Sequence, residues 1–186
     1  RKTLVSISVN KPQFNKVNDF KKYPRNIKND IYLLKKAKVD YLYLPTVNQI
    51  YSKKKGKKIK LHPFSKKLCG KFRPNHFKAV LNVIDKFIEI INPTKIYLGK
   101  KDFQQLKIVE NYVRKKYKKI KVMGCKTIRE KNGIPMSSRN LLLNSYQKKI
   151  ASSVYNFLKS KKKDIVTGKI NHKKIINKLF LFKIKK

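Results

Sequence analysis

The chain reads Ile96-Tyr97-Leu98-Gly99-Lys100-Lys101-Asp102-Phe103-Gln104-Gln105-Leu106 where an apolar, strand-like run meets a helical pattern. Gly99 permits a sharp turn, and Asp102 is a good helix N-cap with Gln105 three residues later, as in a capping box. The amides of the next helical turn and the two lysines can then face a phosphate. The stretch therefore predicts either a phosphate-handling site or an ordinary strand-turn-helix connection with solvated lysines.

Strand-like and helical patterns alternate on both sides of this stretch. Strands are predicted over residues 3–9, 39–44, 95–98 and 120–123, and helices over 27–37, from 73–77 through 91, over 103–113 and over 145–158. This alternation predicts an α/β fold with a parallel sheet covered by helices on both faces. Ligands of such sheets gather outside the carboxyl ends of strands, so the loops at 10–14 and 99–102 are predicted to share one cleft.

Apolar residues at helical spacing identify the predicted buried faces. They are Val80, Val83, Ile84, Phe87 and Ile91 in one helix, and Phe103, Leu106, Val109, Tyr112 and Val113 in the next. Each stripe is expected to pack against the sheet.

Residues 135–140 form a third segment that could hold a phosphate. After a turn at Asn132-Gly133, this segment offers two adjacent hydroxyls and a guanidinium, which suit a triphosphate; a polar loop that caps the next helix is the alternative. The nucleotide-binding domain is predicted to span residues 1–142, and residues 143–186, with a short helix at 170–179, are too few for a full second domain. The lysine-rich run at 52–60 is predicted to be a mobile surface loop, and phosphate steering is its alternative role.

The formal net charge of +41 invites a nucleic-acid-binding hypothesis. Only six of the 50 basic residues are arginine, however, and base readout and bidentate phosphate contacts favour the planar guanidinium. The lysines are spread along the whole chain, which indicates drift toward A/T-rich codons. A basic nucleic-acid-binding protein therefore remains only an alternative, and no specific nucleic-acid partner is predicted.

The number of cysteines and the hydropathy pattern predict the cellular compartment. Cys69 and Cys125 belong to no metal-ligand cluster, and each is expected to be a small core-like thiol. Two cysteines and no signal-peptide pattern fit a reducing, cytoplasmic compartment. Apolar residues occur in short periodic segments, so no membrane partner is predicted.

Several longer motifs occur in one colinear order across residues 5–140. They are Val5-Ser6-Ile7-Ser8-Val9-Asn10, Gln13-Phe14, Tyr23-Pro24-Arg25, Arg73-Pro74-Asn75-His76-Phe77, Asp102-Phe103-Gln104-Gln105-Leu106 and Ser137-Ser138-Arg139-Asn140. In their order and spacing the chain resembles the pantothenate synthetase family, whose members join pantoate to β-alanine at the expense of ATP.

The resemblance implies a Rossmann-like fold of the nucleotidyltransferase type, a homodimer, and ATP with Mg²⁺. In the implied reaction the pantoate carboxylate attacks the α-phosphate of ATP and releases pyrophosphate. The amine of β-alanine then attacks the pantoyl adenylate to give pantothenate and AMP. A degenerate, inactive remnant of such a ligase is the alternative within the family.

The resemblance also implies which residues bind each substrate. Gln13 and Gln105 would hold pantoate, and Gln13 and Asn10 would border the β-alanine site. The residues that would hold ATP are Gly99, Lys100, Lys101, Asp102, Ile128, Met136, Ser137, Ser138 and Arg139. Of these, Lys101, Ser137, Ser138 and Arg139 are the predicted catalytic residues, because they can stabilise charge that gathers on the phosphates. No metal site made of protein ligands is predicted.

The chain departs from the family pattern at several places. The first ATP motif, which carries histidines, and the first strand are expected upstream of Arg1, and the C-terminal domain is shorter than usual. Lys100 stands where Glu is usual, Lys11-Pro12 replaces a Pro-x pair, Asn75 and Ala79 stand at glycine positions, and Met136 replaces Leu. The chain as it stands is therefore expected to be a truncated ligase and a poor enzyme.

Overall fold

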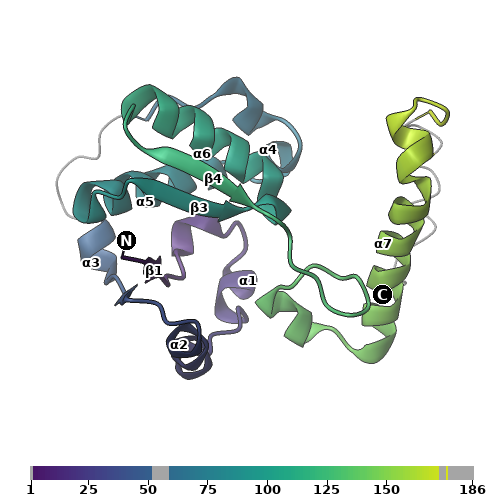
Figure 1. Ribbon diagram of the computed structural model, residues 1–186, viewed down its shortest axis with the longest axis horizontal. Coiled ribbons are helices and arrows are strands. Elements are labelled where there is room, and N and C mark those ends of the chain that lie inside the picture. The colour runs from purple at the N-terminus through teal and green to yellow at the C-terminus, as the bar shows by residue number, and fades with distance from the viewer. Residues whose placement is uncertain (1, 52–58, 172–174, 176–186) are drawn as a thin grey trace. The chain divides into compact units, whose positions relative to one another are not determined.

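The computed structural model describes residues 2–51, 59–171 and 175, and the chain divides into two compact units, Arg1–Lys126 and Thr127–Lys186 (Figure 1). The lysine-rich run predicted as a loop and the helix predicted at 170–179 lie mostly outside the described residues. The predicted domain boundary after residue 142 stays a prediction.

The described strands all belong to the first unit and pair in parallel. Strand β1 (Leu4–Ser6) pairs with β2 (Tyr41–Tyr43), and β3 (Lys95–Gly99) pairs with β4 (Lys121–Cys125). These pairs are two separate two-stranded sheets among the described residues, where the sequence predicted one sheet. The α/β class with parallel strands is confirmed.

Short helices occupy much of what the sequence predicted to be loop. The helices of the first unit are η1 (Lys11–Gln13), α1 (Val17–Lys21), α2 (Ile27–Lys36), α3 (Val47–Ile50), η2 (Pro63–Lys66), α4 (Cys69–Phe72), α5 (His76–Ile91), η3 (Lys100–Asp102) and α6 (Phe103–Lys116), and those of the second are η4 (Ser138–Leu142) and α7 (Ser145–Val166). Helix α7 begins at a capping box between Asn144 and Gln147 and continues past the predicted end at 158.

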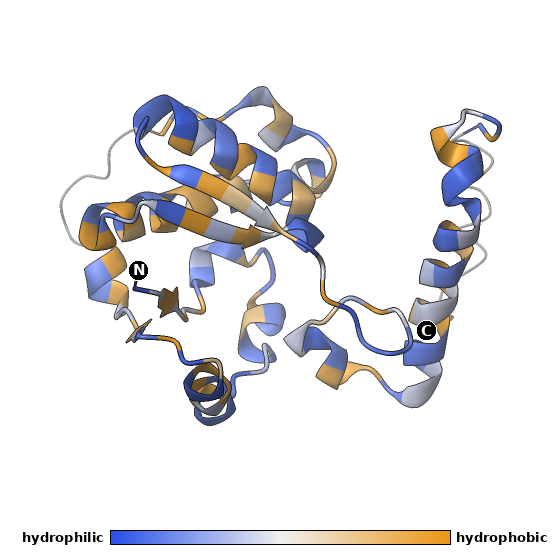
Figure 2. Ribbon diagram, viewed as in Figure 1, coloured by the Kyte–Doolittle hydropathy of each residue, from blue (hydrophilic) through white to orange (hydrophobic). Residues whose placement is uncertain are grey.

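The core of the first unit lies between α5, α6 and the β3–β4 pair. Its buried members are Phe77, Val80, Leu81, Ile88, Ile108, Val109 and Val113. Apolar residues accordingly lie along α5 and both strands, while much of the outer surface of α6 is hydrophilic (Figure 2). The predicted stripe of α6 is wrong at Phe103, the first residue of the helix, which is 55% exposed.

One face of the β3–β4 pair is exposed in the part of the chain that the structure describes. Tyr97 and Met123 lie opposite each other in register and are 62% and 41% exposed. Cys125, two residues after Met123, points to the same face, since strand side chains alternate. Both Cys125 and Cys69 are exposed free thiols, so the prediction of core-like cysteines is wrong.

Candidate functional site

The predicted substrate-binding residue Asn10 follows strand β1 and is the N-cap residue of η1. Its side chain is buried, with the residue 7% exposed. The hydroxyl of Tyr51 donates to Asn10 Oδ1 at 2.6 Å, while Asn10 Nδ2 has no hydrogen-bond partner among the described residues. A buried amide NH2 without an acceptor is costly, so this group is a candidate ligand contact.

The other end of η1 is held by the start of helix α5. The backbone oxygen of Gln13 accepts a hydrogen bond from Arg73 Nη2 at 2.9 Å and lies 2.9 Å from His76 Nδ1. Because a carbonyl only accepts, Nδ1 of His76 carries the proton. Both ends of η1 are therefore fixed by residues distant in sequence, and Arg73 and His76 belong to a motif to which the sequence analysis gave no role.

The pKa of His76 depends on residues from three segments of the first unit. Burial lowers the pKa of His76, the Arg73 charge lowers it further, and the contact with Gln13 and the charge of Asp102 act in the opposite direction. The net lowering keeps the imidazole neutral at pH 7. His76 thus contacts the segment after β1 and is acted on by the charge of Asp102 in the segment after β3.

The residue before His76 explains one departure from the family pattern. Asn75 has a φ of 61°, in the left-handed region that usually requires glycine. Asparagine adopts this region more readily than other side chains do, so it replaces glycine with limited strain.

The turn after β3 differs from the prediction in its backbone. Gly99 has a φ of −70° and a ψ of 133°, an extended conformation that any residue adopts, so the turn does not require glycine. A Cβ atom built at Gly99 would have no described protein atom within 4 Å. The space beside Gly99 is therefore open to a ligand.

The predicted capping box at the start of α6 does not form. Asp102 occupies the N-cap position of α6, but its side chain makes no capping hydrogen bond. The 3-10 turn η3 runs directly into α6, and the carboxylate of Asp102 instead lies 3.7 Å from Lys101 Nζ. The prediction was wrong because the chain enters α6 through a helical turn and not from an extended residue.

The two adjacent glutamines of α6 have different environments. Gln104 is buried, and its side chain accepts from Cys69 N at 3.1 Å and donates to the carbonyl oxygens of Phe64 and Lys67 at 2.8 and 2.7 Å. It therefore fixes the segment from η2 to α4, a role that the sequence did not reveal. Gln105, the predicted pantoate ligand, is half-buried.

The second unit contains the remaining predicted ATP residues. Ile128 and Met136 are 63% and 57% exposed, and the Met136 amide donates to the Ile128 carbonyl at 3.0 Å. Ser137 is the N-cap of η4, and its Oγ accepts from the Arg139 amide at 3.3 Å. Ser137 thus caps the short helix that this segment itself forms, whereas the next helix, α7, is capped by Asn144 outside the segment. The phosphate role of the segment stays a prediction.

Asn140 holds the shape of this loop, a role that the sequence analysis missed. Its Nδ2 donates to Glu130 Oε1 at 2.6 Å and to the Pro135 carbonyl at 3.0 Å. The predicted turn at Asn132-Gly133 is confirmed, with Gly133 at a φ of 89°. The predicted ATP-binding role of Met136, Ser137, Ser138 and Arg139 stays a prediction.

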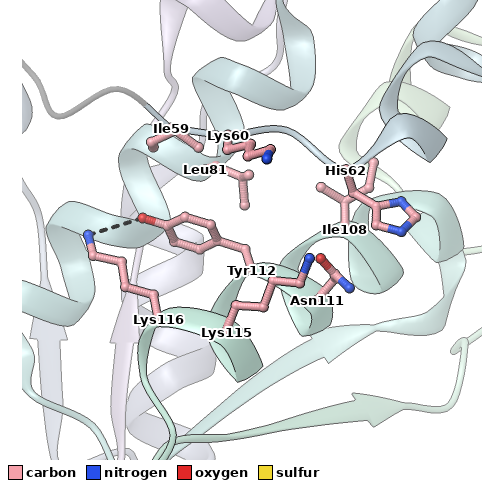
Figure 3. A pocket seen from close by; sticks show the side chains of 9 residues that line it. All are labelled: Ile59, Lys60, His62, Leu81, Ile108, Asn111, Tyr112, Lys115 and Lys116. Carbon is pink, nitrogen blue, oxygen red and sulfur yellow. Dashed lines mark hydrogen bonds between the residues drawn. The ribbon is translucent and has the colours of Figure 1, made fainter.

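Two cavities lie beside α6 in the first unit. One, of about 410 Å³, is lined by apolar and polar side chains, among them Leu81, Ile108 and Tyr112, and Figure 3 shows the hydrogen bond from Lys116 to the Tyr112 hydroxyl. A second, of about 630 Å³, borders the outer surface of α6 and β4. Neither is lined by a predicted site residue.

Residues 2–51, 59–171 and 175 contain no cluster of three or more His, Cys, Asp or Glu side chains able to hold a metal ion. Within the same ranges, no helix is both long enough and apolar enough to cross a membrane.

Comparison with known proteins gives one consistent result. Residues 1–184 match the family model described as pantoate-beta-alanine ligase. The pantothenate synthetase of Endomicrobium trichonymphae is 40% identical over 179 residues, covering 95% of this chain and 63% of that protein. That of Thermodesulfovibrio yellowstonii is 39% identical over 156 residues, covering 84% of this chain and 56% of that protein.

Solved structures agree with these sequence matches. Pantothenate synthetase from Thermus thermophilus superposes with a TM-score of 0.83 at 32% identity, covering 90% of this chain and 61% of that one. A Francisella tularensis pantoate-beta-alanine ligase, solved with beta-gamma ATP and beta-alanine, gives 0.84 at 34% identity, covering 98% and 68%. The chain thus spans about three-fifths of the length of these relatives. On the family match over residues 1–184, this chain belongs to the pantoate-beta-alanine ligase family.

Proposed function

We propose that the protein to which this chain belongs condenses pantoate with β-alanine, using ATP and releasing AMP and pyrophosphate. The observation that carries the proposal is the buried NH2 group of Asn10 after β1, which has no hydrogen-bond partner among the described residues, in a chain that matches the ligase family along its length. The Francisella relative was solved with a β,γ ATP compound and β-alanine, which supports both substrates.

Amide side chains are suited to hold pantoate. We assign Gln13 and Gln105 to the carboxylate and hydroxyls of pantoate, and Asn10 and Gln13 to the border of the β-alanine site. An amide both donates and accepts hydrogen bonds and adds no net charge, so it can bind the hydroxyls and the carboxylate of pantoate together. Because η1 is fixed at both ends, its side chains need little reorganisation when the substrate binds.

The first chemical step concentrates negative charge on phosphate oxygens. A pantoate carboxylate oxygen bonds to the α-phosphorus, and the bond from that phosphorus to the β-phosphate bridging oxygen breaks, which releases pyrophosphate. Lys101, Ser137, Ser138 and Arg139 are proposed to stabilise the transferring and leaving oxygens. The open space beside Gly99 would let a phosphate approach the backbone closely.

The second step needs position more than acid-base chemistry. The free amine of β-alanine attacks the acyl carbon of the pantoyl adenylate, the bond to AMP breaks, and the ammonium of the intermediate loses its proton. Neutral His76 lies at the end of η1 that also carries Gln13. Holding the amine near the acyl carbon can supply much of the rate enhancement.

We propose that Mg²⁺ enters with ATP as a complex and not in a protein-made cage. Mg²⁺ commonly binds through one or two carboxylates together with substrate phosphates. Asp102 is the carboxylate of the proposed ATP segment, and its side chain is 63% exposed beside Lys101. Asp102 could thus take part while the phosphates neutralise most of the charge of the metal.

A homodimer and a cytoplasmic location complete the proposal, and both rest on the family resemblance. Light scattering after size-exclusion chromatography tests the first, and fractionation of the source cells tests the second. A monomer under the assay conditions, or recovery in the membrane fraction, would remove the respective part. The family match does not favour a nucleic-acid-binding function.

The activity test uses the product of the whole reading frame that contains these residues. Incubated with pantoate, β-alanine and Mg·ATP, it should form pantothenate with AMP and pyrophosphate in equal amounts, which mass spectrometry and a pyrophosphate assay measure. Each substrate omitted in turn provides the control. Release of ADP instead of AMP would refute the adenylate mechanism, and no pantothenate would refute the function.

A further inference from the structure

We infer that Tyr51 is a positioning residue, whose hydroxyl orients the Asn10 side chain so that its NH2 group, at the border of the β-alanine site, donates to an oxygen of the pantoate bound next to that site. This inference rests on the proposed function, because it names what orients one of the proposed substrate contacts. It adds a residue to which neither the sequence patterns nor the family resemblance gave a role.

The first step is the fixed end of the Asn10 amide. The Tyr51 hydroxyl lies 2.6 Å from Asn10 Oδ1, and the two residues are 41 positions apart in the sequence. An amide oxygen only accepts, so the phenol must donate. Burial raises the pKa of Tyr51 although its bond to Asn10 acts in the opposite direction, so the hydroxyl keeps its proton at neutral pH.

The second step is the free end of the same amide. When Tyr51 holds Oδ1, the Asn10 amide is fixed with Nδ2 pointing away from Tyr51. Asn10 is only 7% exposed. Nδ2 is buried and has no partner among the described residues. A buried donor in this state lowers stability unless an acceptor is supplied, and a carboxylate or hydroxyl oxygen of a bound substrate would supply one.

The third step concerns the short helix α3, whose backbone carries Tyr51 in a fixed position. Tyr51 is the C-cap residue of α3, and its amide donates to the Val47 carbonyl at 2.8 Å. Helix α3 begins with a complete capping box between Thr46 and Gln49. The short helix therefore presents the hydroxyl from a defined backbone position, which an effective positioning group requires.

Tyr51→Phe tests the inference because it removes the hydroxyl and keeps the ring. Tyr43→Phe is the matched control, since the Tyr43 hydroxyl is also buried but has no partner among the described residues, and its ring packs on Phe87 at 5.6 Å. The first measurement is the Asn10 side-chain NH2 signal in ligand-free protein, assigned by its loss in Asn10→Asp. Tyr51→Phe should shift it, and Tyr43→Phe should leave it in place.

The second measurement is pantoate binding, followed through the same NH2 signal, and the KM values for pantoate and ATP. Tyr51→Phe should weaken pantoate binding and raise its KM about tenfold, the effect of one oriented hydrogen bond, with the KM for ATP unchanged. Tyr43→Phe should leave all of these values unchanged.

The possible failures separate the inference from the proposed function. If wild-type protein binds pantoate but Tyr51→Phe changes neither the NH2 signal nor the affinity, the positioning role is refuted and the function stands. A shifted signal with unchanged affinity also refutes the role. If wild-type protein does not respond to pantoate, the proposed function fails, and the inference fails with it.

Discussion

Replacing Asp85 by alanine should destabilise the first unit more than any removal of a surface carboxylate. Asp85 is buried in α5, and its Oδ1 accepts hydrogen bonds from the hydroxyls of Tyr112 and Tyr117 at 2.6 and 2.5 Å and from Lys116 Nζ at 2.5 Å. The three donors lie in the last part of α6 and just after it. Asp85 therefore ties the two helices of the core together.

The size of the effect follows from these contacts. A hydrogen bond to a charged group contributes about 1.5–3 kcal/mol, so three of them set an upper limit near 9 kcal/mol. Lys116 is 32% exposed and regains water when its partner is lost, and the phenols do so in part. We therefore expect a loss of about 3 kcal/mol, at the low end of the range for breaking a buried pair.

Urea and thermal unfolding measure this loss. A change of 3 kcal/mol corresponds to a fall in Tm of about 6–12 °C for a chain of this size. Glu110→Ala is the control, because it removes one carboxylate that only pairs with the exposed Lys107 at 2.7 Å, and it should cost at most about 1 kcal/mol. Equal losses for the two variants would refute the reasoning.

The pH dependence of the same difference gives a second check. Burial raises the pKa of Asp85, but the bonds from Lys116, Tyr112 and Tyr117 outweigh it and hold the pKa below the ordinary 3.8. Since the folded value is the lower one, the stabilisation by Asp85 is complete above about pH 4 and is lost as the pH falls further. A stability difference between wild type and Asp85→Ala that stays constant down to pH 2 would contradict this assignment.

Three further predictions concern single residues. Gln104→Ala should cost about 2–3 kcal/mol in urea unfolding, because it removes three hydrogen bonds to the backbone and takes away the acceptor of the Cys69 amide; an unchanged midpoint would refute the role of Gln104 in fixing this segment. Gly133→Ala should cost about 2 kcal/mol, since its φ is 89° and a Cβ would lie 2.1 Å from Tyr155; Tm measures this, and a rise in Tm would contradict it. Lys101→Ala should slow pantoate-dependent exchange between pyrophosphate and ATP well over tenfold, while Lys107→Ala should not; equal rates would remove Lys101 from the site.

Local patterns in the sequence determined the class of the fold. The alternation of strands and helices predicted the parallel β3–β4 pair and the helices α5 and α6, because the period of the apolar residues reports directly which face each element buries. The family was also evident from motifs in fixed order. The turn at Asn132-Gly133 was predicted correctly, since a left-handed residue limits the choice of side chain.

Details of the candidate site depended on contacts between distant segments. Nothing in the sequence near Asn10 indicated that Tyr51 would hold its amide, or that Arg73 and His76 would both meet the Gln13 carbonyl. Such contacts arise only after the sheet and α5 bring the segments together, and periodicity carries no information about them.

The sequence by itself therefore determined the order of the main strands and helices, most of the buried stripes of α5 and α6, and the family. Tertiary structure decided how the turn after Gly99 enters α6, which of Gln104 and Gln105 is buried, and which polar atom of Asn10 has no partner in the part of the chain that the structure describes. The physical reason is that propensity and hydrophobic period act over a few residues, whereas a side-chain hydrogen bond or the burial of one particular amide depends on atoms that only the folded chain brings together.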